Sequence, residues 1–65
     1  MKSVAVTVWQ DRSVSHEDAA PWIVDEIDAA GNSSTVQVFT VRQEAVAFGR
    51  CHAKAHGLVF DGVAQ

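Results

Sequence analysis

Three residues able to bind metal or to act as nucleophiles lie close together near the end of the chain: Cys51, His52 and His56. On a helix, His52 and His56 would be four residues apart and would point the same way, as paired metal ligands do. A zinc site needs further ligands, but the chain has no second cysteine, and its remaining histidine, His16, lies far away in the sequence. We therefore expect no metal and no other cofactor. A small metal protein or enzyme using His16, Cys51, His52 and His56 is the third of our hypotheses.

Covalent catalysis finds little support in the same residues. Cys51 and His52 are adjacent, so on a helix they point about 100° apart and do not readily pair, and a mid-helix cysteine is most often a small apolar filler. A second group contains the residue types of a catalytic triad but crowds one loop without the strand, turn and helix that a triad needs: Ser13, Ser15, His16 and Asp18. The chain is predicted not to be an enzyme.

Charge is distributed unevenly. The formal net charge is −3, but the segment from Asp11 to Asp28 holds six carboxylates against the single cation of Arg12. On a strand, Glu26 and Asp28 would project from one face about 6.6 Å apart. Ordered carboxylates attract basic partners and speed the encounter with them. The predicted partner-binding residues are Asp11, Glu17, Asp18, Asp25, Glu26 and Asp28.

The cations Arg42, Arg50 and Lys54 gather later in the chain, with Glu44 among them. Phosphate binding requires a denser concentration of lysine and arginine than this. We interpret these residues as an ordinary solvated helix face and expect no direct binding of nucleic acid.

The 65 residues allow one domain, residues 1–65, with a modest core. One cysteine permits no internal disulfide and fits a reducing compartment. The first ten residues, MKSVAVTVWQ, are too short and too alternating for a signal peptide or a membrane span. These features predict a cytoplasmic protein of a bacterial host cell, as a monomer or a homodimer.

The elements that must position these side chains centre on a helix over residues 41–56. Thr40 and Gln43 have the spacing of a capping box, and Gly57 is a typical helix stop. The residues expected to face the sheet recur at intervals of three and four and are Val41, Ala45, Phe48, His52 and Ala55.

Strands are predicted on both sides of that helix. Residues 3–10 alternate with no polar face, which indicates a central strand covered on both sides. Residues 18–30 can be interpreted as a helix or as a strand over 22–28. We favour the strand, because Ala29 to Asn32 then forms a hairpin turn to a strand over 34–39. After the helix, residues 58–60 form a short last strand, and Asp61 with Gly62 signals a turn.

The predicted fold is therefore α+β, a small two-layer domain. A three-stranded antiparallel sheet carries one helix on one face, and the short last strand follows the helix.

Several of these residues also resemble a family of short bacterial domains of unknown function. The pattern consists of Trp22-x-Val24, Phe39, Glu44-Ala45, Gly49-Arg50, Ala53 and Gly57, and it extends from Trp22 to Gly62. The chain departs from that family after the helix, where the usual longer final strand is shortened to LVFDG. The resemblance implies the strand hairpin followed by a helix, and it implies no activity or catalytic residues.

In size and acidity alone, the chain is similar to the small inhibitors of phages and mobile elements, such as anti-CRISPR proteins. Our leading hypothesis is a non-enzymatic, acidic, DNA-mimicking inhibitor. Its partner would be a basic nucleic-acid-binding protein, such as a CRISPR effector complex, whose DNA-binding surface it would occupy. The alternative is a homo-oligomeric structural or accessory domain that pairs through a sheet edge or the helix face.

Overall fold

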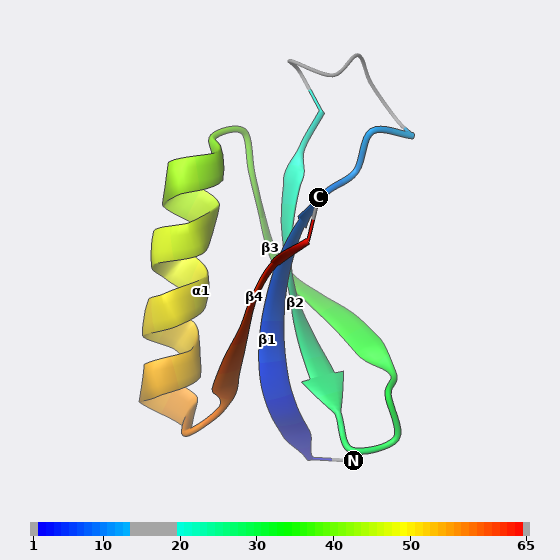
Figure 1. Cartoon of the computed structure of the whole chain (residues 1–65), viewed down its shortest axis with the longest axis vertical. Coiled ribbons are helices and arrows are strands. Elements are labelled where there is room, and N and C mark those ends of the chain that lie inside the picture. The colour runs from blue at the N-terminus through cyan, green and yellow to red at the C-terminus, as the bar shows by residue number, and fades with distance from the viewer. Residues whose placement is uncertain (1, 14–19, 65) are drawn as a thin grey trace.

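The computed structural model describes residues 2–13 and 20–64, which form two layers (Figure 1). One layer is a four-stranded sheet made of β1 (Ser3–Gln10), β2 (Trp22–Asp28), β3 (Ser33–Phe39) and β4 (Val59–Ala64). The other is the helix α1 (Arg42–His56), which covers one face of the sheet. The α+β class and the single helix on one face are as predicted.

The strand order is β3-β2-β1-β4. β1 pairs antiparallel with β2, and β2 pairs antiparallel with β3, as the predicted hairpin requires. The tight turn between them is held by the side chain of Asp28, whose Oδ1 accepts hydrogen bonds from the backbone N–H groups of Ala30 and Asn32 at 2.9 and 3.0 Å. Gly31 supplies the left-handed residue of this turn with a φ of 89°. The strand interpretation of residues 22–28 is confirmed, and β3 begins one residue earlier than predicted.

The last strand corrects the predicted sheet. β4 has six residues rather than three and runs parallel to β1, which makes the sheet mixed and places β1 at its centre. Asp61 and Gly62 do not end the strand in a turn. The pairing shifts there, since Val6 faces Phe60 whereas Val8 faces Val63, and the φ of Gly62 is 96°. The turn-like pair is thus a local irregularity inside a strand, accommodated by a glycine.

The start of α1 also differs from the prediction. Val41 is the N-cap residue, with an extended φ of −121° and ψ of 127°, and no side chain caps the helix. The predicted capping box of Thr40 and Gln43 is wrong because it lies one residue too early for this N-cap. The other end is confirmed. The N–H of Gly57 bonds to the carbonyl of Lys54, and the N–H of Leu58 bonds to that of Ala53 at 2.8 Å, which is a Schellman motif.

The face of α1 turned to the sheet is made of small residues. Ala45, Gly49 and Ala53 are its buried residues, whereas Phe48 and His52 are half-buried and Val41 and Ala55 are exposed. The predicted stripe was therefore displaced around the helix. Small side chains allow α1 to approach closely, so that a Cβ built on Gly49 would lie 3.0 Å from a methyl carbon of Val8 and from the ring of Phe60.

The core lies between α1 and the sheet. Its fully buried large side chains are Val6, Val8 and Val24, and half-buried aromatic rings such as Phe39 and Phe60 pack around them. No element in the described part of the chain covers the opposite face of the sheet (Figure 1). On that face Ala5, Thr7 and Trp9 of β1 are half-buried, so the expectation that β1 is covered on both sides stays a prediction. The strand pairing places both apolar and polar residues on this second face, namely Thr7, Trp9, Ile23, Asp25, Ile27, Ser33, Thr35, Val38 and Val59.

Candidate binding surface

The carboxylates predicted to bind a partner are separated by the strand geometry. Asp25 and Glu26 are neighbours on β2, so their side chains point to opposite faces of the sheet. Asp25 is only 6% exposed, and its Oδ2 accepts a hydrogen bond of 2.8 Å from the indole N–H of Trp9. Its Oδ1 is buried and has no hydrogen-bond partner. Glu17 and Asp18 lie outside the described residues.

Glu26 faces α1 and joins three elements. Its Oε1 accepts a hydrogen bond of 2.7 Å from the hydroxyl of Ser3 on β1, and its Oε2 pairs with Nε2 of His52 on α1. The hydrogen bond from Ser3 and the pairing with His52 hold the pKa of Glu26 below its ordinary value. The side chains of Glu26 and His52 are 25% and 14% exposed. Glu26 is thus committed to holding α1 against the sheet.

Asp28 and Asp11 serve the local backbone at opposite ends of β2. The backbone N–H of Asn32, followed by that of Ala30, holds the pKa of Asp28 below its ordinary value. Asp11 accepts from the backbone N–H and the hydroxyl of Ser13. The four described carboxylates of the predicted set therefore make separate contacts and do not converge on one surface.

The histidines form a stacked row along α1. The ring of His52 stacks on Phe48 with 5.6 Å between centroids, and the ring of His56 lies 4.4 Å from that of His52. Cys51 is exposed on another side of the helix, so it is not the apolar filler that its position suggested. No three Cys, His, Asp or Glu side chains within residues 2–13 and 20–64 are arranged to hold a metal ion. His16 lies outside the described residues.

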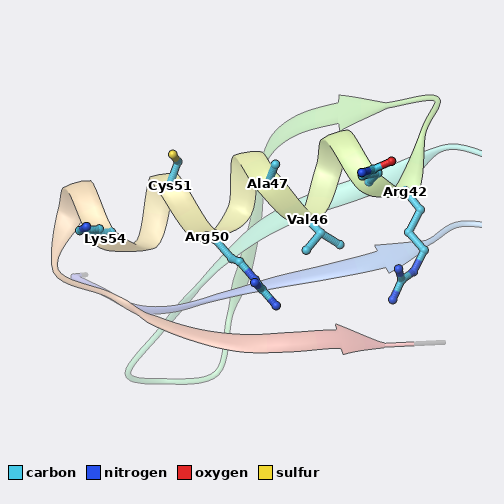
Figure 2. A pocket seen from close by; sticks show the side chains of 7 residues that line it. Arg42, Val46, Ala47, Arg50, Cys51 and Lys54 are labelled. Atoms are coloured by element: carbon cyan, nitrogen blue, oxygen red, sulfur yellow. The ribbon is translucent and has the colours of Figure 1, made fainter.

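A hollow lies along the flank of α1 (Figure 2). We call it the α1 groove. It is open and shallow, with a volume of about 440 Å³. Arg42, Val46 and Arg50 point from the helix towards the strands, whereas Ala47 and Cys51 point the other way. The residues that line the groove form two rows at intervals of four, one being Arg42, Val46, Arg50 and Lys54, and the other Gln43, Ala47 and Cys51.

The α1 groove is basic at its margin and apolar at its floor. Arg42, Arg50 and Lys54 line it, whereas none of the carboxylates within residues 2–13 and 20–64 does. Glu44 belongs to another side of the helix, because it falls in neither row. Val46, Ala47 and Cys51 supply the apolar and weakly polar contacts between the cations.

Two of the cations are held in place by aromatic rings. The guanidinium carbon of Arg42 lies 5.8 Å from the ring centroid of Trp22, and that of Arg50 lies 5.6 Å from that of Phe60. Cation–π contacts of this kind contribute about 0.5–1 kcal/mol at exposed sites. The rings of Trp22 on β2 and Phe60 on β4 therefore favour positions of the two arginines beside the sheet.

The sequence analysis did not identify this groove, because it interpreted the three cations as an ordinary solvated helix face. The signal that could have found it is the interval of four that joins Arg42, Arg50 and Lys54 through Val46. This interval places them in one row, and Glu44 does not interrupt that row.

Comparison with known proteins finds no matching family model, no matching characterised protein and no matching solved structure. In the part of the chain that the structure describes, no helix is long and apolar enough to cross a membrane.

Proposed function

We propose that the chain is a non-enzymatic binding protein whose contact site is the α1 groove, and that the groove receives an acidic amphipathic helix of a partner protein. The observation that carries this proposal is the convergence of three cations, and of no carboxylate among the described residues, on one apolar hollow of about 440 Å³.

The shape of the groove favours a helix as its occupant. A groove between two rows of residues at intervals of four accepts the corresponding ridge of another helix, with the axes crossing at about −50°. Val46, Ala47 and Cys51 would contact the apolar side chains of that ridge. Burying apolar area contributes about 25 cal/mol per Å², so these contacts would add to the affinity.

Charge then selects among helices. Carboxylates on either side of the incoming ridge would face Arg42, Arg50 and Lys54. Exposed ion pairs contribute about 0.2–1 kcal/mol each. Their larger effect is on the rate of encounter and on the rejection of basic partners. Because the rings of Trp22 and Phe60 already position the arginines, less side-chain entropy is lost on binding.

A nucleic-acid ligand fits the same surface less well. Arg42 and Lys54 are twelve residues apart on the helix, which is about 18 Å. A duplex carries roughly ten phosphates over that length, and three cations would neutralise fewer than a third of them. The apolar floor would contribute nothing to phosphate binding.

The test uses two synthetic helical peptides with the same apolar ridge, one flanked by glutamates and the other by lysines. We expect saturable binding of the acidic peptide, measured by fluorescence anisotropy. Replacing Arg50 by glutamate should weaken binding roughly five- to thirtyfold, which is the loss of one charge pair and the addition of one repulsion, about 1–2 kcal/mol.

The matched control is Lys2→Glu, which makes the same change in net charge at a residue that does not line the α1 groove. It should leave the affinity unchanged. The proposal fails if the two peptides bind equally, if Lys2→Glu weakens binding as much as Arg50→Glu, or if an oligonucleotide binds with the same dependence on Arg50.

The acidic, DNA-mimicking inhibitor is retained as a second hypothesis, which the excess of carboxylates between Asp11 and Asp28 favours. It requires a basic partner, which is the opposite charge preference. Changing Glu17 and Asp18 to lysine should then abolish inhibition of a nucleic-acid-binding complex, whereas Arg50→Glu should not. Undiminished inhibition by the double variant would refute this hypothesis.

A further inference from the structure

We infer that a second hollow, at the C-terminal end of α1, binds a small zwitterion, namely an α-amino acid. This hollow has a volume of about 230 Å³. It lies where the end of α1 and the start of β1 meet at one end of the molecule (Figure 1), and its lining residues are Lys2, Ser3, Glu26, His56 and Leu58. None of them lines the α1 groove, so the inference does not rest on the function proposed for that groove.

Glu26 supplies a fixed carboxylate in the wall of the hollow. Its Oε1 accepts the 2.7 Å hydrogen bond from Ser3, and its Oε2 pairs with His52. These two contacts hold the pKa of Glu26 below its ordinary value, so the group is ionised at neutral pH. A carboxylate has about four lone-pair sites, and these contacts use two of them. Because the side chain is 25% exposed, a bound ammonium group can reach the others.

Lys2 and His56 supply hydrogen-bond donors to the same hollow. Both are exposed, and neither the ammonium group of Lys2 nor the ring nitrogens of His56 form a hydrogen bond or an ion pair within residues 2–13 and 20–64. The ring of His56 packs on that of His52, with 4.4 Å between the centroids. Lys2 therefore offers three unused N–H donors and His56 at least one, which suits a carboxylate as the acceptor.

The presence of both signs of charge selects against simpler ligands. An amine without a carboxylate would be attracted by Glu26 but repelled by Lys2, and a carboxylate without an amine would be repelled by Glu26. A zwitterion can place its ammonium group against Glu26 and its carboxylate against Lys2 and His56. Both of its charged groups are then paired.

The size of the hollow and its apolar wall define the rest of the ligand. Drug-sized ligands occupy pockets of about 300–1,000 Å³, and this hollow is smaller. Leu58 is half-buried and provides an apolar contact. We therefore expect an amino acid with a small apolar side chain. Because so small a ligand has few atoms to contribute, the expected dissociation constant is on the order of 1–10 mM.

The test is a titration of the purified chain with L-alanine, followed by NMR through the backbone amide of Leu58 and the ring protons of His56. Ethylamine and propionate are the matched ligands, because they are alanine without its carboxylate and alanine without its ammonium group. We expect saturable shifts with alanine and binding at least about fivefold weaker for each of the other two.

Lys2→Met removes the cation but keeps a long side chain, and it should weaken alanine binding roughly two- to fivefold, as the loss of one exposed ion pair does. The matched control is Lys54→Met, which makes the same change near His56 but at a residue that lines the α1 groove instead. It should leave the affinity unchanged. Both lysines are exposed, and circular dichroism establishes that each variant is folded.

Saturable binding of alanine that is weakened by Lys2→Met, together with weaker binding of ethylamine and propionate, would support the inference. The absence of a saturable shift up to about 100 mM alanine would overturn it. Binding of ethylamine or propionate as tight as that of alanine would also overturn it, as would an equal loss of affinity in Lys54→Met and Lys2→Met.

Discussion

Replacing Gly49 by alanine has two opposing effects on the free energy of unfolding, and their sizes can be compared. In an exposed helix interior, the change from glycine to alanine stabilises by about 1 kcal/mol. At this position the new Cβ would lie 3.0 Å from Cγ2 of Val8 and 3.0 Å from Cε1 of Phe60. Carbon atoms prefer about 3.5–4.0 Å, so both contacts are too close.

The outcome depends on which neighbour can move. Val8 is fully buried in the central strand and is β-branched, so it cannot retreat, whereas the half-buried Phe60 on β4 can turn aside. Overpacking a core typically costs about 1–3 kcal/mol. We expect the cost to exceed the gain in helix propensity and the variant to lose about 1 kcal/mol of stability.

The measurement is urea unfolding followed by circular dichroism, with the slope near 1 kcal/mol per molar that suits a small domain. The midpoint should fall by roughly 1 M. Ala47→Gly, on the outer side of the same helix, measures the propensity term alone and should lose about 1 kcal/mol. Phe60→Leu should relieve part of the clash, so the double variant with Gly49→Ala should lose less than the sum of the two single losses.

A Gly49→Ala variant that gains as much stability as Ala47→Gly loses would refute the close approach of α1 to the sheet. Equal losses in the double variant and in the sum of its parts would show that Phe60 does not bear the strain.

Three further predictions follow from single contacts. Glu26→Gln should reduce the loss of stability between pH 7 and pH 3. A carboxyl with a lowered pKa stabilises the fold above its unfolded pKa and loses that contribution as the pH falls below about 4.5. An equal fall of the unfolding midpoint between pH 7 and pH 3 in the parent and the variant would contradict this prediction. Trp9→Phe should cost about 1–3 kcal/mol, because it leaves the buried carboxylate of Asp25 without its donor. Trp22→Phe is the control for the loss of an indole ring, and an equal loss there would exclude the hydrogen bond as the cause. Gly57→Ala should destabilise by about 1 kcal/mol and Gly57→Asn by less, since the residue has a φ of 68°, and equal thermal midpoints for the two variants would argue against backbone strain.

The hairpin and the end of the helix could be predicted because their signals are local. The turn after β2 has its glycine and its aspartate within four residues. Gly57 ends α1 with the backbone conformation that its residue type favours. In both places the chain is directed by residues that touch their own neighbours in sequence.

β4 could not be predicted in the same way, because its partner is at the other end of the chain. Ala5 pairs with Val59, and nothing near Asp61 and Gly62 indicates that a strand continues through them. The face of α1 was misplaced for a related reason. Hydrophobic spacing favoured Val41 and Phe48 beside Ala45, whereas close packing on the sheet buried Gly49 and Ala53 with Ala45.

The α1 groove was missed for the same reason, because the buried face of α1 was predicted in the wrong place. Once the small residues face the core, Arg42, Val46, Arg50 and Lys54 form one row along the flank of α1, and the groove lies between this row and the row of Gln43, Ala47 and Cys51. The separation of the carboxylates follows from the alternation of a strand, which places Asp25 and Glu26 on opposite faces although they are adjacent in sequence.

The parallel pairing of β4 with β1 bears on how the chain folds during synthesis. β1 leaves the ribosome first, but the strand on its second side and the helix that covers Val6 are made last. Until β4 is made, β1 is the edge strand of the nascent β1–β2–β3 meander and is rich in valine. An edge of this kind can pair with strands of other chains. Contacts of such long sequence separation also slow folding relative to local ones. Loss of β4 would therefore leave β1, an inner strand of the sheet, with an unpaired edge.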